Sequence, residues 1–304
     1  MNINLYQIQY DENTAAKDAS GLLTFDCREN PEFLKREIAH LIRFYDEVVV
    51  HANNDDYFGL FSPKFTEKTK LSIFDVKAFI EQNIGQNIYL FNPFPMLVYK
   101  HLNMWEQGEA GHMGLQQITN QLFHQARIDF NVDSLHRQNH KQVVYCNYWV
   151  ANKLTFDKVM PLIKQLDLLC ETDVEIREKI LSHTHYTGGE ACFYPFVFER
   201  ILSTFLYLNK NIKVLPYEYD SSHIAITSMK KLEKKFYQSS LRAEFRDWEL
   251  AGNKSVEEIK LKIDLISNYM YPQSKSKAMK SALKVLNLFK FNQLKKALKL
   301  SNHD

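Results

Sequence analysis

The chain of 304 residues lacks the marks of secreted and membrane-spanning proteins. Its four cysteines lie far apart and form no C-x-x-C pair, so neither a disulfide framework nor a zinc ribbon is expected. The first residues, MNINLYQIQYDEN, have neither the basic start nor the apolar stretch of a signal peptide. No hydrophobic run approaches the roughly 18 residues that a transmembrane helix needs. We therefore expect a cytoplasmic protein with free thiols.

A strong excess of charge is missing as well. The net formal charge is +2, so overall charge does not indicate a nucleic-acid partner, and none is expected. The exception is the segment 274–303, which contains eight lysines and no acidic residue. Hydrophobic residues make up 45% of the chain, which is enough for a large core. Aromatic residues make up 13%, and most of these rings are expected to fill that core.

Strand and helix patterns alternate over the first 220 residues. Apolar runs predict strands at 3–10, 47–52, 57–62, 88–91, 142–152 and 212–219. Helical periodicity predicts helices at 31–45, 72–83, 96–106, 113–127, 155–171, 173–183 and 194–209. Such alternation predicts an α/β fold, a Rossmann-like and mainly parallel sheet flanked by helices. Only helices are predicted afterwards, so we expect one domain at 1–220 and a helical carboxyl-terminal region at 221–304.

Polar side chains gather where several predicted strands end. The sequence HANNDD follows the second predicted strand, and NPFP with NMWEQGEAGHMG follows the strand at 88–91. Asn147 lies within the strand predicted at 142–152, and HYTGGEACF precedes the apolar helix at 194–209. Ligands of open α/β sheets bind beyond the carboxyl ends of the strands. The pattern therefore predicts a cleft for a small molecule at that edge.

Several of these blocks carry a family resemblance. NLYQIQYDEN, DDYFGLFSPKFTEKTKLS, IYLFNPFP, NMWEQGEAGHMGL, YCNYWVANKLTFDKVM and YPFVFERILSTFLYLN follow one another between residues 3 and 220. In this order they resemble a group of bacterial glycosyltransferase-like proteins linked to capsule and lipopolysaccharide gene clusters. That group is similar in outline to nucleotide-sugar transferases of the GT-A fold. The resemblance implies a GT-A-like fold, with a nucleotide sugar bound by the first half and a glycan or lipid-linked acceptor by the second.

The sequence departs from that family pattern at the metal site. Most GT-A enzymes carry a D-x-D motif after the fourth strand, where two carboxylates hold a divalent cation against the diphosphate. Here the matching strand ends in Asn92, Pro93 and Phe94, so no metal ligands are assigned. The resemblance then favours Asn92, with the cations of Lys64, Lys68 and Arg200, for holding the donor. Ordinary solvent-exposed lysines are an equally good interpretation of Lys64 and Lys68.

The segment after that strand contains Trp105, Glu106, Glu109 and His112. We favour a substrate site, in which the indole stacks on a sugar or base and the acids bind hydroxyl groups. The carboxylates and the imidazole could instead hold a metal ion, which would suit a metal-dependent hydrolase. A purely structural loop is the third interpretation, since the spacing E-x-x-E-x-x-H is weakly specific.

Glu199 is the candidate catalytic base. It lies on the predicted helix at 194–209 among apolar residues, where a buried acid needs a function or a partner. An inverting glycosyl transfer, which we assume, needs one carboxylate to accept the proton of the acceptor hydroxyl. An ion pair with Arg200 is about as good an explanation. Asn147 and His185, which lies in the glycine-containing loop before the helix, complete the predicted acceptor site.

The basic carboxyl end predicts an amphipathic helix over 274–300, with apolar residues on one arc and lysines opposite. Such a helix can lie on an anionic membrane, on the inner face of the bacterial membrane in this interpretation. It can also pack its apolar arc on the protein or on a partner helix. For the whole chain we expect a glycosyltransferase of surface-glycan synthesis. The alternative is a glycan- or lipid-binding protein that keeps the sheet without catalysis.

Overall fold

The computed structural model describes residues 1–15, 21–29, 32–184, 191–252, 254–273 and 276–300. Backbone contacts divide the chain into two compact units. The first comprises Met1–Pro93 and Asn103–Glu218, and the second comprises Phe94–Leu102 and Tyr219–Asp304. The second unit thus begins at Tyr219 after the sheet, and it also takes a short segment from the middle of the chain, which the division at 220 did not include.

The first unit is built on a mixed sheet of six strands in the order β2-β1-β3-β5-β4-β6. The strands are β1 (Ile3–Gln9), β2 (Leu23–Asp26), β3 (Tyr57–Phe61), β4 (Ile88–Leu90), β5 (Trp149–Asn152) and β6 (Val214–Pro216). β1 is parallel to β2 and β3, and β4 is parallel to β6. β5 alone runs antiparallel to its neighbours β3 and β4. The α/β class is confirmed, with a roughly Rossmann-like sheet that is not purely parallel.

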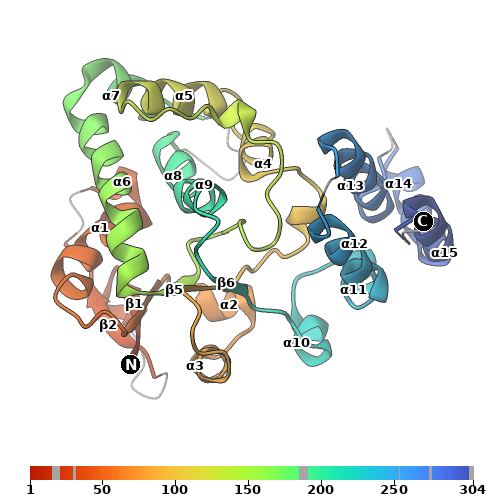
Figure 1. The fold of residues 1–304 in the computed structure, drawn as a ribbon, viewed down its shortest axis with the longest axis horizontal. Helices are drawn as coiled ribbons and strands as arrows, with labels where there is room; N and C mark the ends of the chain where they lie inside the picture. Colours follow the sequence, from red (N-terminus) through yellow and green to blue (C-terminus); the bar gives the residue numbers. More distant parts are fainter. Residues whose placement is uncertain (16–20, 30–31, 185–190, 253, 274–275, 301–304) are drawn as a thin grey trace. The chain divides into compact units, whose positions relative to one another are not determined.

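Helices cover both faces of this sheet, because alternate strand residues point to opposite sides. Phe58 of β3 packs with α1 (Glu37–Phe44) and α6 (Lys153–Thr172). Phe61 of the same strand stacks on Phe65 of α2 (Phe65–Thr69), with ring centroids 4.1 Å apart. Figure 1 shows α1 and α6 on one side of the sheet and α2 and α3 (Ile73–Gln82) on the other.

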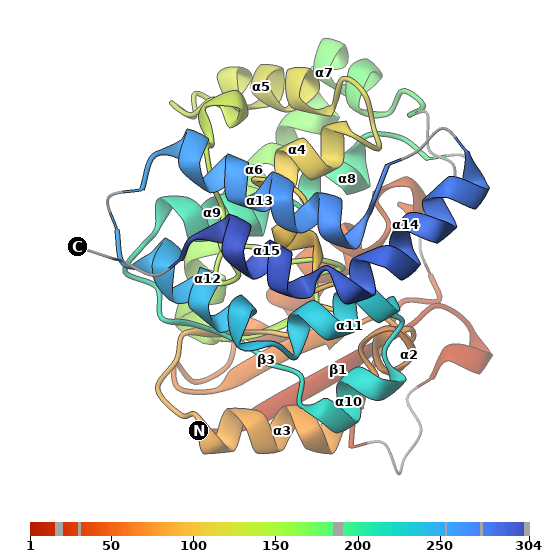
Figure 2. The same ribbon diagram turned by 90° about the vertical axis from the view of Figure 1, so that its right-hand side faces the viewer.

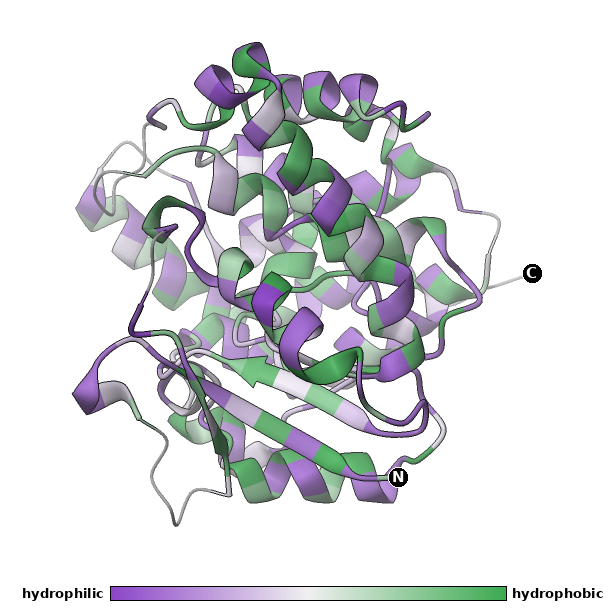
Figure 3. Ribbon diagram, turned by 90° about the vertical axis from the view of Figure 1, so that its left-hand side faces the viewer, coloured by the Kyte–Doolittle hydropathy of each residue, from purple (hydrophilic) through white to green (hydrophobic). Residues whose placement is uncertain are grey.

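Hydropathy follows this arrangement. Every residue of β3 is buried, whereas β1, one strand nearer the sheet's edge, mixes hydrophobic and hydrophilic residues (Figure 3). Gly59 in β3 has no room for a side chain, because a Cβ there would come within 2.8 Å of Val150 Cγ2 on β5. The remaining helices of this unit are α4 (Met104–Glu109), α5 (Leu115–Gln125), α7 (Val174–Ile180), α8 (Tyr194–Phe198) and α9 (Ile201–Leu208).

Several sequence predictions are wrong in detail. The helix predicted at 96–106 is a 3-10 turn over Leu97–Tyr99, followed by α4 from Met104. The strand predicted at 47–52 is a π-helical turn over Tyr45–Val49 that continues α1, in which Val49 is buried and Val50 is exposed. The strand predicted at 142–152 is paired only from Trp149, so Asn147 lies in the preceding turn. The helix predicted at 194–209 is interrupted at Glu199 and Arg200. The short strand β2 was not predicted at all, since most of its residues are exposed.

The second unit is helical, as predicted. Its elements are the 3-10 turn Leu97–Tyr99 and the helices α10 (Ser221–Ile226), α11 (Lys231–Tyr237), α12 (Ser240–Leu250), α13 (Val256–Met270), α14 (Lys277–Phe289) and α15 (Phe291–Leu298). Tyr99 packs edge-on against Phe236 and Phe245, which anchors the segment 94–102 in this core. The helix predicted at 274–300 is divided at Lys290 into α14 and α15 (Figure 2). Among the described residues, no helix is both long and apolar enough to cross a membrane.

Candidate functional site

The carboxyl ends of the parallel strands bring polar side chains to one edge of the sheet, although the predicted segment HANNDD is not among them, since it leads into the amino end of β3. Tyr10 follows β1, Ser62 follows β3 and Asn92 comes shortly after β4. β5 is antiparallel, so its amino end, preceded by Tyr148, lies at this same edge. The hydroxyls of Ser62 and Tyr148 share a hydrogen bond of 2.8 Å and are both buried. This edge is the candidate site.

Glu37 is the most perturbed acid of the candidate site. It lies in the first turn of α1, and burial together with the charge of Glu199 raises its pKa to about 7. Lys68 and a hydrogen bond from Ser62 offset only part of that shift. Tyr148, Ser62 and Glu37 therefore form a short chain of hydrogen-bonding groups. A carboxyl group whose pKa lies near neutrality can both accept and release a proton at physiological pH.

Glu199 is placed by the break between α8 and α9. One of its carboxylate oxygens, Oε1, accepts a hydrogen bond of 2.7 Å from the backbone N–H of Cys146. The other oxygen, Oε2, is 4.0 Å from Nη1 of Arg200. This ion pair is weaker than the hydrogen bond from Cys146. The side chain keeps 25% of its surface exposed. Glu199 is therefore held in one orientation while part of it remains accessible.

Lys68 of α2 supplies positive charge to this pair of acids. Its Nζ is 3.5 Å from Sγ of Cys146 and lies over the ring of Tyr148, 5.8 Å from the centroid. The positive charge of Lys68 lowers the pKa of Glu37. The Cys146 thiol itself is held in the neutral form, because burial and the charge of Glu199 raise its pKa to about 12. Lys64, one turn earlier, is exposed at the start of α2.

The backbone around both acids is strained. Arg36, directly before Glu37, has φ 51° and ψ −133°. Cys146 and Asn147 are consecutive residues with φ of 61° and 53°. Such conformations cost on the order of 1–3 kcal/mol each for residues other than glycine, and they concentrate at functional sites. The two acids are thus presented by segments whose conformations the surrounding structure must enforce.

Asn92 enforces the conformation of the segment before β5. Its carboxamide oxygen accepts a hydrogen bond of 2.9 Å from the backbone N–H of Tyr145, and its Nδ2 donates one of 2.7 Å to the carbonyl of Val143. The carbonyl of Asn147 accepts a hydrogen bond of 3.2 Å from Trp149. Asn92 is therefore a positioning residue for the turn that holds Glu199. The half-buried side chain of Asn147 lies on that turn.

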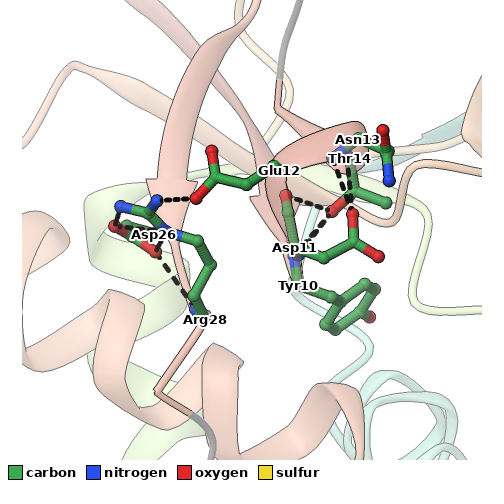
Figure 4. A network of polar contacts seen from close by, with 7 residues as sticks. All are labelled: Tyr10, Asp11, Glu12, Asn13, Thr14, Asp26 and Arg28. Atoms are coloured by element: carbon green, nitrogen blue, oxygen red, sulfur yellow. Dashed lines mark hydrogen bonds and ion pairs between the residues drawn. The ribbon is translucent and has the colours of Figure 1, made fainter.

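A second group of residues borders the site at the ends of β1 and β2. Figure 4 shows Arg28 bound to Asp26 and Glu12, with Asp11 and Thr14 capping the turn that follows Tyr10. The ring of Tyr10 lies 5.5 Å from that of His40 on α1. His40 is buried, and its Nε2 has no hydrogen-bond partner in the described part of the chain. Burial and the charge of Arg43 lower the pKa of His40 to about 4, so its imidazole is neutral.

Two predicted ligand-binding residues instead belong to the interior. Trp105 is fully buried, donates a hydrogen bond of 3.0 Å from its indole nitrogen to Thr204, and cannot stack on a sugar. Arg200 is also buried, and its guanidinium donates hydrogen bonds to the Met104 and Phe196 carbonyls and the Gln107 side chain. The guanidinium that the sequence predicted to bind the diphosphate therefore binds groups of the protein instead. Neither residue is retained in the site.

The other acids and the imidazole of that segment also have structural contacts. Glu109 accepts hydrogen bonds from the backbone N–H groups of Gly114 and Gln116, so it caps α5. His112 is buried, with its ring stacked 3.6 Å from that of Phe196. Glu106 is half-buried in the first turn of α4. Among the described residues, no group of three or more His, Cys, Asp or Glu side chains could hold a metal ion.

The candidate site is therefore Glu37, Glu199, Lys68, Ser62 and Tyr148, and three of these were not predicted. Glu37 had no distinguishing signal, since an acid in the first turn of a helix is ordinary. His185 lies outside the described residues. A separate cavity of about 780 Å³ runs along α5, and its lining includes neither acid of the site.

Comparison with known proteins adds no assignment to this geometry: no family model, no curated protein and no solved structure matches the chain.

Proposed function

We propose that the chain is a glycosyltransferase that moves a sugar from a nucleotide-sugar donor to a hydroxyl of a surface-glycan precursor. The observation that carries the proposal is the pairing of Glu37 and Glu199 beside Lys68 at the carboxyl edge of the sheet. Ligands of α/β folds bind at this edge. A GT-A-like arrangement of the sheet, as the sequence resemblance implies, belongs to the same proposal.

The two acids act as one proton-accepting unit in this proposal. When the acceptor oxygen bonds to the anomeric carbon of the donor, its proton passes to the carboxylate pair. Glu37 is the acid that holds the proton, because the charge of Glu199 adds to burial in raising its pKa. The raised pKa of Glu37 keeps the transferred proton bound near neutral pH. The bond from the anomeric carbon to the diphosphate oxygen breaks at the same time, and the diphosphate carries away the electron pair.

Lys68 stabilises the leaving diphosphate. A positive charge placed where negative charge develops is among the largest contributions to catalysis. Lys68 is half-buried, and its Nζ is held near the Cys146 thiol and the Tyr148 ring. Lys64 is exposed nearby and can add a second, weaker contact to the donor. Asn147 is left with the role of orienting the acceptor, as expected from the sequence.

The test is transfer or donor hydrolysis by the purified chain with a panel of nucleotide sugars. Loss of a positioned acid–base group costs about 10²- to 10⁴-fold in kcat. Glu37→Gln and Glu199→Gln should each lower kcat by that factor. Lys68→Met should also lower kcat, and it should move the rise of kcat to higher pH, because the charge of Lys68 lowers the pKa of Glu37. The matched controls Glu81→Gln on α3 and Lys158→Met on α6 change exposed residues of the same unit and should retain wild-type rates.

Full activity of Glu199→Gln and Glu37→Gln would remove the acid pair from the mechanism. Wild-type protein that shows no thermal shift with any nucleotide or nucleotide sugar and turns over no donor would instead support the non-catalytic glycan- or lipid-binding alternative. A ligand at 100 times its Kd stabilises a protein by about 2.7 kcal/mol, which such a titration resolves.

A further inference from the structure

Helix α14 of the second unit turns an apolar face outward. Met279, Leu286 and Phe289 are 61%, 44% and 81% exposed, and Ala282 between them is exposed as well. These four residues are spaced three and four apart, so they form one stripe on the helix. We name Met279, Ala282, Leu286 and Phe289 the α14 stripe. The sequence alone left open whether this arc packs on the protein, and the structure leaves it exposed.

The opposite face of α14 fixes the helix to its own unit. Asn287 donates a hydrogen bond of 2.8 Å to the carbonyl of Tyr269 on α13. The carbonyl of Leu288 accepts a hydrogen bond from Lys235 on α11. Lys280 and Lys284, on this inner side, are half-buried. These contacts fix the orientation of α14 about its own axis. The α14 stripe therefore stays on the exposed side of the helix.

Positive charge lies on the arc of α14 opposite the α14 stripe and along α15. From residue 277 to 299 the chain has no acidic residue and carries Lys277, Lys280, Lys284, Lys290, Lys295, Lys296 and Lys299. An apolar cavity of about 280 Å³ opens beside the helix. Leu232, Met270, Val285 and Leu288 line it together with Lys230, Lys231 and Lys284. Apolar surface and cationic groups thus occur together at two neighbouring places on the same unit.

We propose that the α14 stripe docks on an anionic phospholipid surface. The apolar side chains would enter the boundary of the acyl chains, and the lysines would contact the phosphate headgroups. Charge decides between the possible occupants. A second copy of the chain would bring an equally basic face and would be repelled, whereas an anionic bilayer is complementary to both the lysines and the stripe. The proposal concerns the second unit and is independent of the proposed glycosyl transfer.

The test is vesicle flotation with the full chain. It should float with vesicles of phosphatidylcholine mixed with phosphatidylglycerol at low salt, and much less with pure phosphatidylcholine. Phe289→Ser should weaken binding about 10- to 100-fold, because it removes one large apolar side chain from the contact. Lys277→Gln and Lys296→Gln should each weaken it about fivefold, the effect of one lysine near the surface. F289W keeps the apolar contact, and its fluorescence should shift to shorter wavelength on the mixed vesicles.

Matched controls come from α13 of the same unit. Leu261 is 62% exposed and Lys260 is exposed, so Leu261→Ser and Lys260→Gln change the same kinds of residue away from the α14 stripe and should bind like wild type. Two outcomes would overturn the proposal. One is the absence of flotation with the mixed vesicles at low salt. The other is a dimer in light scattering that Phe289→Ser abolishes while flotation of the monomer is unchanged, which would assign the stripe to a second copy.

Discussion

Replacing Glu37 by Gln should make the protein more stable at neutral and alkaline pH while it lowers kcat about 10²- to 10⁴-fold. Burial and the charge of Glu199 raise the pKa of Glu37 from 4.5 to about 7. The folded state therefore favours the protonated acid. The stabilisation associated with Glu37 is fully present below pH 4.5 and is lost as the pH rises through about 7.

The magnitude follows from the size of that shift. One pKa unit corresponds to about 1.4 kcal/mol, so the full effect is about 3 kcal/mol. Glu37 keeps part of its surface exposed to solvent, and Gln accepts the hydrogen bond of Ser62 less strongly, so about 1–3 kcal/mol is expected. The free energy of unfolding of Glu37→Gln, relative to wild type, should rise between pH 4.5 and 8 and then stay constant.

Urea denaturation followed by tryptophan fluorescence at a series of pH values measures this difference. Glu81→Gln is the control, since it removes an exposed carboxylate from the same unit and should show no such rise. A difference between Glu37→Gln and wild type that is independent of pH would refute the reasoning, because it would mean that Glu37 titrates like an exposed acid. A second refutation would be Glu37→Gln that is less stable than wild type at pH 8.

Three further outcomes are expected. Gly108→Ala should destabilise the first unit by about 1–3 kcal/mol in urea denaturation, because its Cβ would overlap Arg200, which is held by its own hydrogen bonds; Gly111→Ala, whose Cβ has only ordinary contacts, should be nearly neutral. Burial and the charge of Arg200 lower the pKa of His112 to about 4, so the contribution of His112 to stability is present above pH 6.5 and lost as the pH falls through 4. His112→Phe should therefore flatten the acid side of the curve of unfolding free energy against pH. An unchanged curve would contradict this. EDTA should leave transfer activity unchanged, since no acid pair follows β4 at Asn92; a rate restored only by Mg²⁺ or Mn²⁺ would overturn this.

Local sequence patterns predicted those elements whose residues decide their own structure. The capping box of Ser72 and Asp75 begins α3 where it was expected, because each side chain binds the other's backbone N–H. The apolar run of β3 is buried throughout, so length and composition sufficed. The prediction of a strand at 47–52 was wrong because a short run of valines suits a buried strand as well as a helical turn. In the structure Val49 is buried there and Val50 is exposed.

The candidate site was predicted only in part because tertiary contacts create it. The edge of the sheet and Glu199 followed from the order of strands and from an acid in an apolar segment. Glu37 joins Glu199 only through the packing of α1, which leaves no trace in its local sequence. Trp105 and Glu109 were attractive because polar and aromatic residues gather around them, yet one fills the core and the other caps a helix. Composition near a strand end does not reveal which side chains face outward.

The pH profile of donor turnover tests the acid pair most directly. For wild type, kcat should rise with an apparent pKa near 7, set by Glu37 in its buried position beside the charge of Glu199. In Glu199→Gln any residual rate should show that pKa shifted downward, since the repelling charge is gone. An unchanged profile and an undiminished kcat in both Glu37→Gln and Glu199→Gln would contradict the account.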